Sequence, residues 1–201
     1  MDNQTILTYN ACSEQLATLH ATLSPLKIYE LISKYFVKNG ITADIGCGIG
    51  RDSAWMIEHG FAAIGIDASI GMLKQARARY PNVNFSQDSL PLLAKQKDNY
   101  YANILCSAVI MHLPVDQIGL AAINLVRIVA IDGSIVVSYR GTSGFDSREN
   151  GKLYTPIHES NMINLFLEAG ASLVCIETDL EESRDLTWVN LVFKKLPHPA
   201  V

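Results

Sequence analysis

The stretch that decides the fold is residues 41–67, ITADIGCGIGRDSAWMIEHGFAAIGID. It begins with five residues of mostly apolar character, typical of a buried parallel strand, and a glycine-rich turn at 46–50 follows at once. A helical pattern then covers 52–59, and a glycine ends it. A second apolar run, 61–66, ends on Asp67. The order of strand, glycine turn, helix, strand and acid predicts one half of a nucleotide-binding sheet.

The glycines and the acid have a common chemical interpretation. Without Cβ atoms, the backbone at Gly46, Gly48 and Gly50 can turn tightly and let a ligand approach the N–H groups at the start of the helix. Asp67 then stands where a carboxylate can accept hydrogen bonds from both ribose hydroxyls. The alternative is a tight turn that only joins a strand to a helix.

The spacing of the glycines separates two classes of cofactor. The dinucleotide fingerprint is G-x-G-x-x-G/A, whereas this loop is G-x-G-x-G and has Arg51 where the fingerprint requires a small residue. The stretch instead resembles motif I of the class I S-adenosylmethionine-dependent methyltransferases. In that family the loop faces the methionine carboxylate, so Arg51 can pair with this carboxylate, or it can be an ordinary solvated side chain.

Composition bounds the class of protein. The chain has 201 residues, 49% apolar and 18% charged, which predicts one globular domain. The net charge of −4 argues against a broad phosphate-binding face, so no nucleic-acid partner is expected. The four cysteines lack metal-ligand spacing, and neither a signal peptide nor an apolar run of membrane-spanning length is found. We therefore expect a cytoplasmic enzyme without a metal or a membrane partner, and of unknown oligomeric state.

The remaining sequence predicts an alternating β/α chain. Two helices are expected before the first strand, one capped by Ser13 and one beginning at Ser24-Pro25, while residues 1–12 carry few structural signals. Ser69 is placed to cap the helix that follows Asp67. Further strands are predicted at 83–86, 101–107, 134–138, 171–178 and 187–194, with helices at 115–129 and 158–169.

The resemblance covers about residues 39–195 and implies a complete fold. It implies an α/β, Rossmann-like, doubly wound sheet of seven strands in the order 3-2-1-4-5-7-6, with strand 7 antiparallel, plus N-terminal helices. The whole chain, 1–201, is then a single methyltransferase domain, with 1–38 as a helical lid segment and 39–195 as the cofactor-binding core. One departure is Ile131-Asp132-Gly133-Ser134, where the family usually has Pro-Gly-Gly, but Asp-Gly still predicts a turn.

The resemblance also assigns a cofactor site for S-adenosyl-L-methionine. Asp67 would hold the ribose, Asp88 would accept from the adenine amine, and the Ser89 N–H would face a ring nitrogen. Taken alone, an Asp after a strand is usually a turn residue. The full expected cofactor site is Tyr9, Asp44, Gly46, Cys47, Gly48, Gly50, Arg51, Asp67, Ala68, Ser69, Asp88, Ser89, Ser107 and Ala108.

Catalytic and substrate residues are expected near the ends of the fourth and fifth strands, where open α/β sheets bind ligands. His112 is the candidate base, and the alternative is a histidine that orients the loop or packs on the cofactor. Tyr139 and Arg140 can line a substrate pocket, where Arg140 would suit an anionic substrate, or Arg140 can form a surface salt bridge. The polar segment 142–156, together with the residues before Ser13, is predicted to wall the substrate side and to order on ligand binding; the alternative is a plain surface loop.

These observations predict methyl transfer from S-adenosylmethionine to a small-molecule acceptor by in-line displacement. The alternatives are a methyltransferase acting on RNA or protein and a non-catalytic module that binds the cofactor. The Asp/Asn-Pro-Pro-aromatic run of adenine- and glutamine-directed enzymes is absent, because residues 106–109 read CSAV. The Pro-Cys pair of cytosine C5 enzymes is absent as well.

Overall fold

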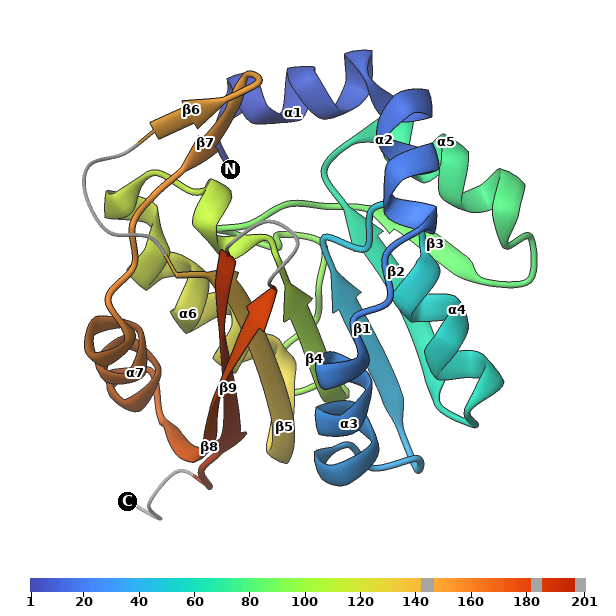
Figure 1. Ribbon diagram of the computed structural model, residues 1–201. Coiled ribbons are helices and arrows are strands. Elements are labelled where there is room, and N and C mark those ends of the chain that lie inside the picture. Colours follow the sequence, from blue (N-terminus) through green and yellow to red (C-terminus); the bar gives the residue numbers. More distant parts are fainter. Residues whose placement is uncertain (142–146, 182–185, 198–201) are drawn as a thin grey trace.

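The computed structural model describes residues 1–141, 147–181 and 186–197. Its centre is a seven-stranded sheet in the order β3-β2-β1-β4-β5-β9-β8, in which β9 runs antiparallel to both neighbours (Figure 1). The strands of this sheet are β1 (Ile41–Ile45), β2 (Ala62–Asp67), β3 (Asn84–Gln87), β4 (Tyr101–Ser107), β5 (Val129–Arg140), β8 (Ala171–Glu181) and β9 (Leu186–Lys195). The predicted strand order and the antiparallel insertion of the last strand are confirmed.

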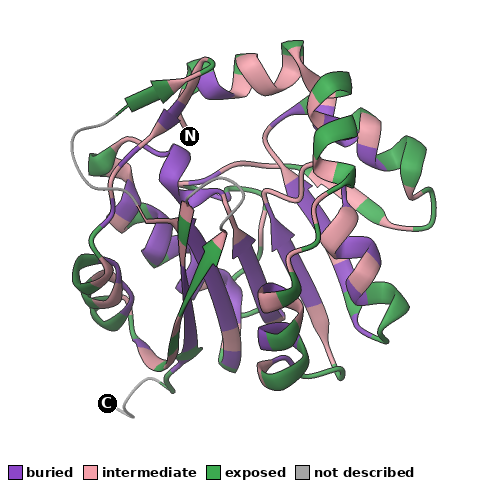
Figure 2. Ribbon diagram, viewed as in Figure 1, coloured by how far each residue is buried: buried purple, intermediate pink, exposed green. Residues whose placement is uncertain are grey.

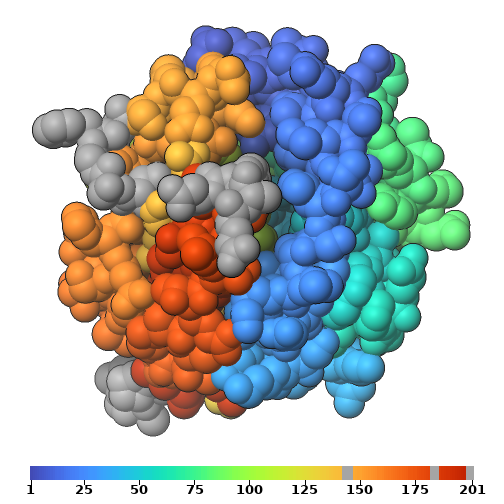
Figure 3. Space-filling model, viewed as in Figure 1, coloured from blue at the N-terminus to red at the C-terminus, as the bar shows by residue number. Residues whose placement is uncertain are grey.

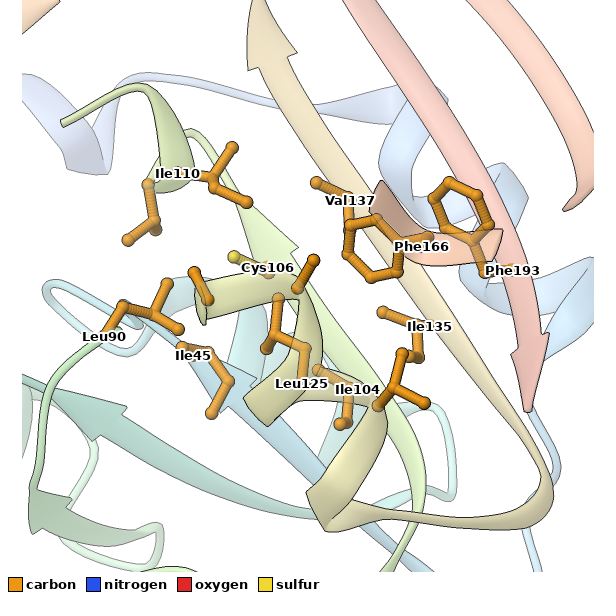
Figure 4. Packing of buried hydrophobic residues seen from close by; sticks show 14 of the residues in the cluster. Ile45, Leu90, Ile104, Cys106, Ile110, Leu125, Ile135, Val137, Phe166 and Phe193 are labelled. Atoms are coloured by element: carbon orange, nitrogen blue, oxygen red, sulfur yellow. The ribbon is translucent and has the colours of Figure 1, made fainter. Parts of the chain in front are cut away.

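Helices cover both faces of this sheet. One face packs on α3 (Leu26–Tyr35) and α4 (Arg51–Glu58) through Leu105, Val136 and Val192. The other face packs on α6 (Val115–Ile128) and α7 (Glu159–Glu168), and here the Phe166 and Phe193 rings stack with centroids 4.2 Å apart (Figure 4). The central strands are buried and the outer faces of the helices are exposed (Figure 2). The chain is therefore a three-layer α/β structure, and its ligand-binding edge is the carboxyl edge of the parallel strands.

The decisive stretch folds as the sequence predicts. β1 pairs parallel with β2, the glycine turn joins β1 to α4, and α4 ends one residue before His59. The Ser69 hydroxyl caps α5 (Ile70–Arg79) by accepting from the backbone N–H of Met72. At the predicted Asp132-Gly133 turn the chain instead continues within β5, with φ 61° at Asp132 and an irregularity where the pairing with β4 jumps from Val129 to Ser134.

The N-terminal helices differ from the prediction. An additional helix, α1 (Asn3–Ala11), precedes α2 (Ser13–Ala21), and Asp2 caps α1 by accepting from the Thr5 N–H. The prediction that Ser13 caps a helix is wrong, because Ser13 is the first residue of α2 and Cys12 precedes it without a side-chain bond. Pro25 likewise occupies the cap position of α3 rather than its first turn. Short caps of this kind are decided by local backbone geometry, which a residue pattern does not determine.

Part of the segment predicted as a loop forms a hairpin. β6 (Ser147–Glu149) and β7 (Lys152–Tyr154) pair antiparallel around Asn150 and Gly151, whose φ angles of 50° and 81° are those of a tight hairpin turn. The other part of that segment, 142–146, lies outside the described residues. So do residues 182–185, which lie between the predicted strands 171–178 and 187–194, and the first of these strands extends to residue 181 as β8.

The hairpin and α1 form a roof above the carboxyl edge of the sheet. In Figure 1, α1 lies across the top of the molecule between the hairpin and α5. Figure 3 shows the N-terminal segment in dark blue beside the hairpin in orange. Thr5 joins the two: its Oγ1 accepts from the Leu153 N–H at 2.9 Å and donates to Asp2, which also pairs with Arg148. At the other end of α1, Asn10 Oδ1 accepts from Ser69 Oγ and from the Gly71 N–H of α5.

Within the described residues, no helix has both the length and the apolar character needed to cross a membrane. The four cysteines are all free thiols. No cluster of His, Cys, Asp and Glu in the described parts of the chain is arranged to hold a metal ion.

Candidate functional site

A cavity of about 230 Å³ lies beneath the roof, at the carboxyl ends of β1, β2 and β4. The glycine loop, the end of β2 and the loop after β3 form one side of it, and the segment after β4 with the hairpin forms the other. Twelve of the fourteen residues expected to bind a cofactor line this cavity, and so does His112: the lining includes Tyr9, Gly46, Cys47, Gly48, Arg51, Asp67, Ala68, Ser69, Asp88, Ser89, Ser107, Ala108 and His112.

The glycine loop is open to the cavity at one position. Gly48 has φ 54°, and a Cβ built there would meet nothing closer than Met72 Cε at 3.6 Å. Gly50 is different, because a Cβ there would lie 2.4 Å from the Phe85 ring. Gly50 is therefore required by packing, whereas the absence of a side chain at Gly48 leaves room for a ligand to approach the backbone of the loop.

Asp67 ends β2 with a carboxylate that stabilises the loop and faces the cavity. The Gly48 N–H donates to Oδ2 at 2.8 Å and the Ser69 N–H donates to Oδ1 at 2.7 Å. Burial raises the pKa of Asp67, and these two backbone bonds act in the opposite direction. Each carboxylate oxygen accepts one of these N–H groups and has a second lone pair for a ligand hydroxyl, so the carboxylate can accept from the two hydroxyls of a ribose.

Asp88 follows β3 and lines the same side of the cavity as the glycine loop. Its Oδ1 accepts from the Ser89 N–H at 2.8 Å, and its Oδ2 accepts from the Lys95 N–H and from Gln96 Nε2, both at 2.9 Å. The carboxylate therefore closes the loop after β3 and has less free hydrogen-bonding capacity than Asp67.

Asp44 and Gly50, the other two residues of the expected cofactor site, lie away from the cavity wall. Asp44 is buried behind the loop, where Ser53 Oγ donates to it at 2.5 Å. Burial, with the nearby charge of Asp52, raises the pKa of Asp44 to about 7. Its position suits a structural support for the turn between β1 and α4.

Arg51 lines the cavity but already has a partner. Its Nε and Nη2 bind the Asp52 carboxylate at 2.8 and 2.9 Å, and its Nη1 donates to the carbonyls of His20 and Leu23. The guanidinium thus connects the start of α4 to the end of α2. The sequence suggested that the positive charge of Arg51 pairs with the methionine carboxylate. In the structure, the negative charge of Asp52 offsets this positive charge.

His112 lies on the opposite wall, in a 3-10 turn, η1 (Ile110–His112), that follows β4. Its Nδ1 is 2.6 Å from the carbonyl oxygen of Leu153, which can only accept, so Nδ1 carries the proton. Its Nε2 lies 3.4 Å from the Tyr9 hydroxyl. Burial lowers the pKa of His112 to about 4, so the ring is neutral at pH 7 and Nε2 carries a lone pair.

The backbone between β4 and η1 is unusual at Ala108. This residue has φ 60°, which costs a non-glycine residue about 1–2 kcal/mol, and its N–H donates to the Ser138 carbonyl. The conformation turns the chain away from the sheet edge and brings Val109 against Gly46, where a Cβ would lie 2.2 Å from Val109 Cγ2. Strained backbone of this kind is concentrated at functional sites.

The two residues expected to contact a substrate do not line this cavity. Tyr139 is fully buried, and Arg140 pairs with Glu149 at 2.9 Å and lies over the Tyr154 ring. Arg140 therefore takes the salt bridge that the sequence left as its alternative role. Seven side chains that the sequence did not name individually line the cavity as well: Met1, Thr5, His20, Met111, Lys152, Tyr154 and Trp188. Four of them, Met1, Thr5, Lys152 and Tyr154, belong to the two segments that were predicted to wall the substrate side.

The roof explains why these residues were missed. Lys152 and Tyr154 reach the cavity because the hairpin folds back under α1, and His20 reaches it from the end of α2. One sequence signal was available, since Asn150-Gly151 is the dipeptide most typical of a two-residue hairpin turn. The docking of the hairpin onto α1 is a tertiary contact with no local signal.

The family comparison agrees with this geometry. Residues 43–133, which hold the glycine loop, Asp67, Asp88 and His112, match the family model of a methyltransferase domain. This match and the fold support an assignment to the class I S-adenosylmethionine-dependent methyltransferases. No curated protein sequence matches this methyltransferase significantly.

Solved structures share the fold of this methyltransferase at low sequence identity. A 1,6-didemethyltoxoflavin-N1-methyltransferase from Burkholderia thailandensis, solved with 1,6-didemethyltoxoflavin and S-adenosylhomocysteine, is 16% identical with a TM-score of 0.78, over 96% of this chain and 88% of that one. An S-adenosylmethionine-dependent methyltransferase from Mesorhizobium loti is 16% identical with a TM-score of 0.70, over 83% and 97%. The cyclase SpnF is 16% identical with a TM-score of 0.67, over 85% and 80%. These likenesses establish the fold.

Proposed function

We propose that this chain transfers a methyl group from S-adenosylmethionine to a small-molecule acceptor by in-line displacement. The proposal rests on one observation: two side chains line the same cavity beneath the roof. They are Asp67, whose carboxylate can accept from ribose hydroxyls, and His112, whose ring is neutral. The Burkholderia thailandensis relative, whose structure holds S-adenosylhomocysteine and a small molecule, supports the acceptor class.

The glycine loop would hold the cofactor, because the open backbone at Gly48 leaves room for a ligand to approach. Asp67 would accept hydrogen bonds from the ribose hydroxyls, and Asp88 with Ser89, whose N–H already donates to Asp88, would lie beside the adenine. The cofactor supplies a methyl group on a sulfonium: the acceptor's lone pair forms the new bond to carbon as the carbon–sulfur bond breaks and leaves its electron pair on sulfur. The chain itself contributes orientation and the exclusion of water.

His112 receives the proton of an acceptor that carries one. The Leu153 carbonyl fixes the tautomer so that the Nε2 lone pair faces the cavity, and Tyr9 lies beside the same atom. A pKa of about 4 keeps this nitrogen unprotonated throughout the neutral range. Because such a nitrogen is a weak base, proton transfer accompanies bond formation rather than preceding it.

The experiment is a transfer assay with methyl-labelled S-adenosylmethionine and three acceptor pools: metabolites below about 1 kDa, total RNA and total protein. Label in the metabolite pool, lost with His112→Ala or Asp67→Ala, is the expected result. Label confined to RNA or protein contradicts the small-molecule acceptor. Cofactor binding without demethylated product in any pool favours a non-catalytic binding module.

A further inference from the structure

A second cavity of about 520 Å³ adjoins the first, between the start of α3, the carboxyl ends of β5 and β8 and the start of β9. The two cavities share Leu23, Arg51, Ser107, Ala108 and Trp188 in their walls. The shared wall is the carboxyl end of β4, where Ala108 leaves the sheet. A molecule in the second cavity can therefore meet a molecule in the first at this point.

The floor of the second cavity is a polar row across three strands. Ser107 of β4 pairs with Ser138 of β5, and Ser138 pairs with Asn190 of β9. Two residues earlier along β4 and β5, the same face carries Leu105, Val136 and their partner Val192, which pack against α3. Because side chains alternate along a strand, the face that is apolar under α3 becomes polar where the cavity begins.

In this row, the polar side chain of Asn190 is the one that the stability of the fold does not account for. Its side chain is 2% exposed, and its Nδ2 has no hydrogen-bond partner among the described residues. A buried amide without a partner costs free energy, and an apolar residue of the same shape would avoid that cost. By contrast, the other fully enclosed asparagine of the sheet, Asn103, bonds to both backbone groups of Val37 and to Thr42.

The charges around the second cavity select the kind of ligand. Its described wall contains three acids, Glu30, Asp179 and Glu181, and two bases. Both bases are paired: Lys27 bridges Glu30 and Glu177, and Arg51 binds Asp52. An anionic ligand would therefore meet no uncompensated positive group in the described wall, whereas a neutral or cationic ligand meets no such penalty.

We propose that the second cavity receives the methyl acceptor, whose reacting atom enters the first cavity, lined by His112, at the shared Ser107 and Ala108, and that Asn190 donates its amide N–H to a carbonyl oxygen or ring nitrogen of a neutral or cationic acceptor. This assignment rests on the proposed methyltransferase function and names its substrate class. Trp188 forms the wall between the two molecules, and its indole N–H is held by Glu181 at 3.0 Å. A fixed indole face in that wall suits a planar acceptor.

The test uses benzamide as the probe, with S-adenosylhomocysteine present at saturation. Benzamide carries a neutral carbonyl on a flat ring, benzoate replaces it with a charge, and toluene removes the acceptor atom. The chain has two tryptophans, so the indole N–H signal of Trp188 in a nitrogen-15 spectrum is assigned by one Trp188→Phe variant. We expect benzamide to shift this signal saturably, and benzoate and toluene to bind at least fivefold more weakly.

The variant Asn190→Leu should weaken benzamide binding at least fivefold while leaving thermal stability unchanged or raised. Asn103→Leu is the matched control and should lower stability, because that amide has partners. Equal affinity for benzamide and toluene, an unchanged affinity in Asn190→Leu, or no shift of Trp188 overturns the assignment. Failure of S-adenosylhomocysteine itself to bind, measured first by calorimetry, overturns the proposed function instead.

Discussion

At the scale of single residues, the carboxylates of Asp67 and Asp88 differ in how much hydrogen-bonding capacity they keep for a ligand. Both face the first cavity, but Asp88 accepts three bonds from its own loop, whereas Asp67 accepts two backbone N–H groups and has a free lone pair on each oxygen. Hydrogen bonds to a charged group contribute about 1.5–3 kcal/mol each. The side chain with more free capacity should therefore contribute more to ligand affinity.

Accordingly, Asp67→Ala should weaken the binding of S-adenosylmethionine by about tenfold or more. Asp88→Ala should weaken it less, because the adenine keeps its contacts with the backbone. Calorimetric titration of both variants, each first shown to be folded by its thermal transition, measures the difference. An Asp67→Ala protein with wild-type affinity would remove the ribose role from this residue.

The lowered pKa of His112 leads to a prediction about stability that can be tested without a substrate. Its pKa is about 4 in the folded chain because burial disfavours the charged ring, with Lys152 acting in the same direction and the Leu153 carbonyl and Asp2 opposing it. An unfolded histidine titrates near 6.5. Between these two pH values the unfolded chain binds a proton that the folded chain does not, so this residue's contribution to stability is lost as the pH falls from 6.5 to 4.

The free energy of unfolding of the wild type, relative to His112→Gln, should therefore fall by up to about 3 kcal/mol across that window. Urea unfolding of both proteins at several pH values between 4.5 and 7.5 gives the difference, in which the shared titration of Asp44 and Asp67 cancels. A difference that does not depend on pH would mean that His112 titrates normally and is not enclosed.

At the scale of elements, the roof is a unit of α1 and the hairpin joined through Thr5. This side chain is 1% exposed, and its Oγ1 both donates to Asp2 and accepts from the Leu153 N–H. Leu153 in turn provides the carbonyl that orients His112. A change at Thr5 should therefore reach the site through the hairpin.

Thr5→Val keeps the shape of the side chain and removes both bonds. Leaving the buried Leu153 N–H without a partner costs about 1–3 kcal/mol. We expect amide hydrogen exchange to rise together in 3–11 and 147–154, with less change in the sheet. Thr18→Val, which removes an exposed bond within α2, is the control. Faster exchange in α1 alone would show that the hairpin does not depend on it.

The elements also show what the sequence could predict. β1, the glycine turn, α4 and β2 each carry a pattern that matches their own length, so their existence and order follow from local residues. α1 lacks such a pattern: Thr5 is its buried residue, and the helix is held by the Asp2 cap and by contacts with α5 and the hairpin. Tertiary bonds of this kind decide the roof, and they leave no periodic trace in the sequence.

At the scale of the whole molecule, the candidate site divides into a half that local sequence patterns predict and a half that tertiary contacts decide. The half built from the sheet, with the glycine loop, Asp67 and Asp88, could be predicted because strand order places these loops side by side. For the half built from the roof and from the β5–β9 pair, the sequence predicted that 142–156 and the residues before Ser13 form a wall, but not which of their side chains reach the cavity. Arg140 and Trp188, for example, are cross-strand neighbours, but which of them lines a cavity depends on the salt bridge that Arg140 makes with Glu149.

The architecture of the whole chain also predicts which cofactor binds. A dinucleotide needs room for a second nucleotide beyond the pyrophosphate, and the fingerprint for it has a small third residue that lets the helix approach the strand. Here Arg51 stands at that position, and its bonds to Asp52, His20 and Leu23 close the space between α4 and the end of α2. The roof of α1 limits the cavity on the remaining side.

S-adenosylmethionine and S-adenosylhomocysteine should therefore bind with dissociation constants in the micromolar range, and NAD should not bind measurably. Calorimetry with the three ligands under one buffer condition makes the comparison, and Arg51→Ala provides the matched variant. Removing the guanidinium should loosen the contact between α4 and α2 without creating an NAD site, because the glycine spacing is unchanged. Tight NAD binding by the wild type would contradict the cofactor assignment, since the same loop and the same acid would then be holding a dinucleotide.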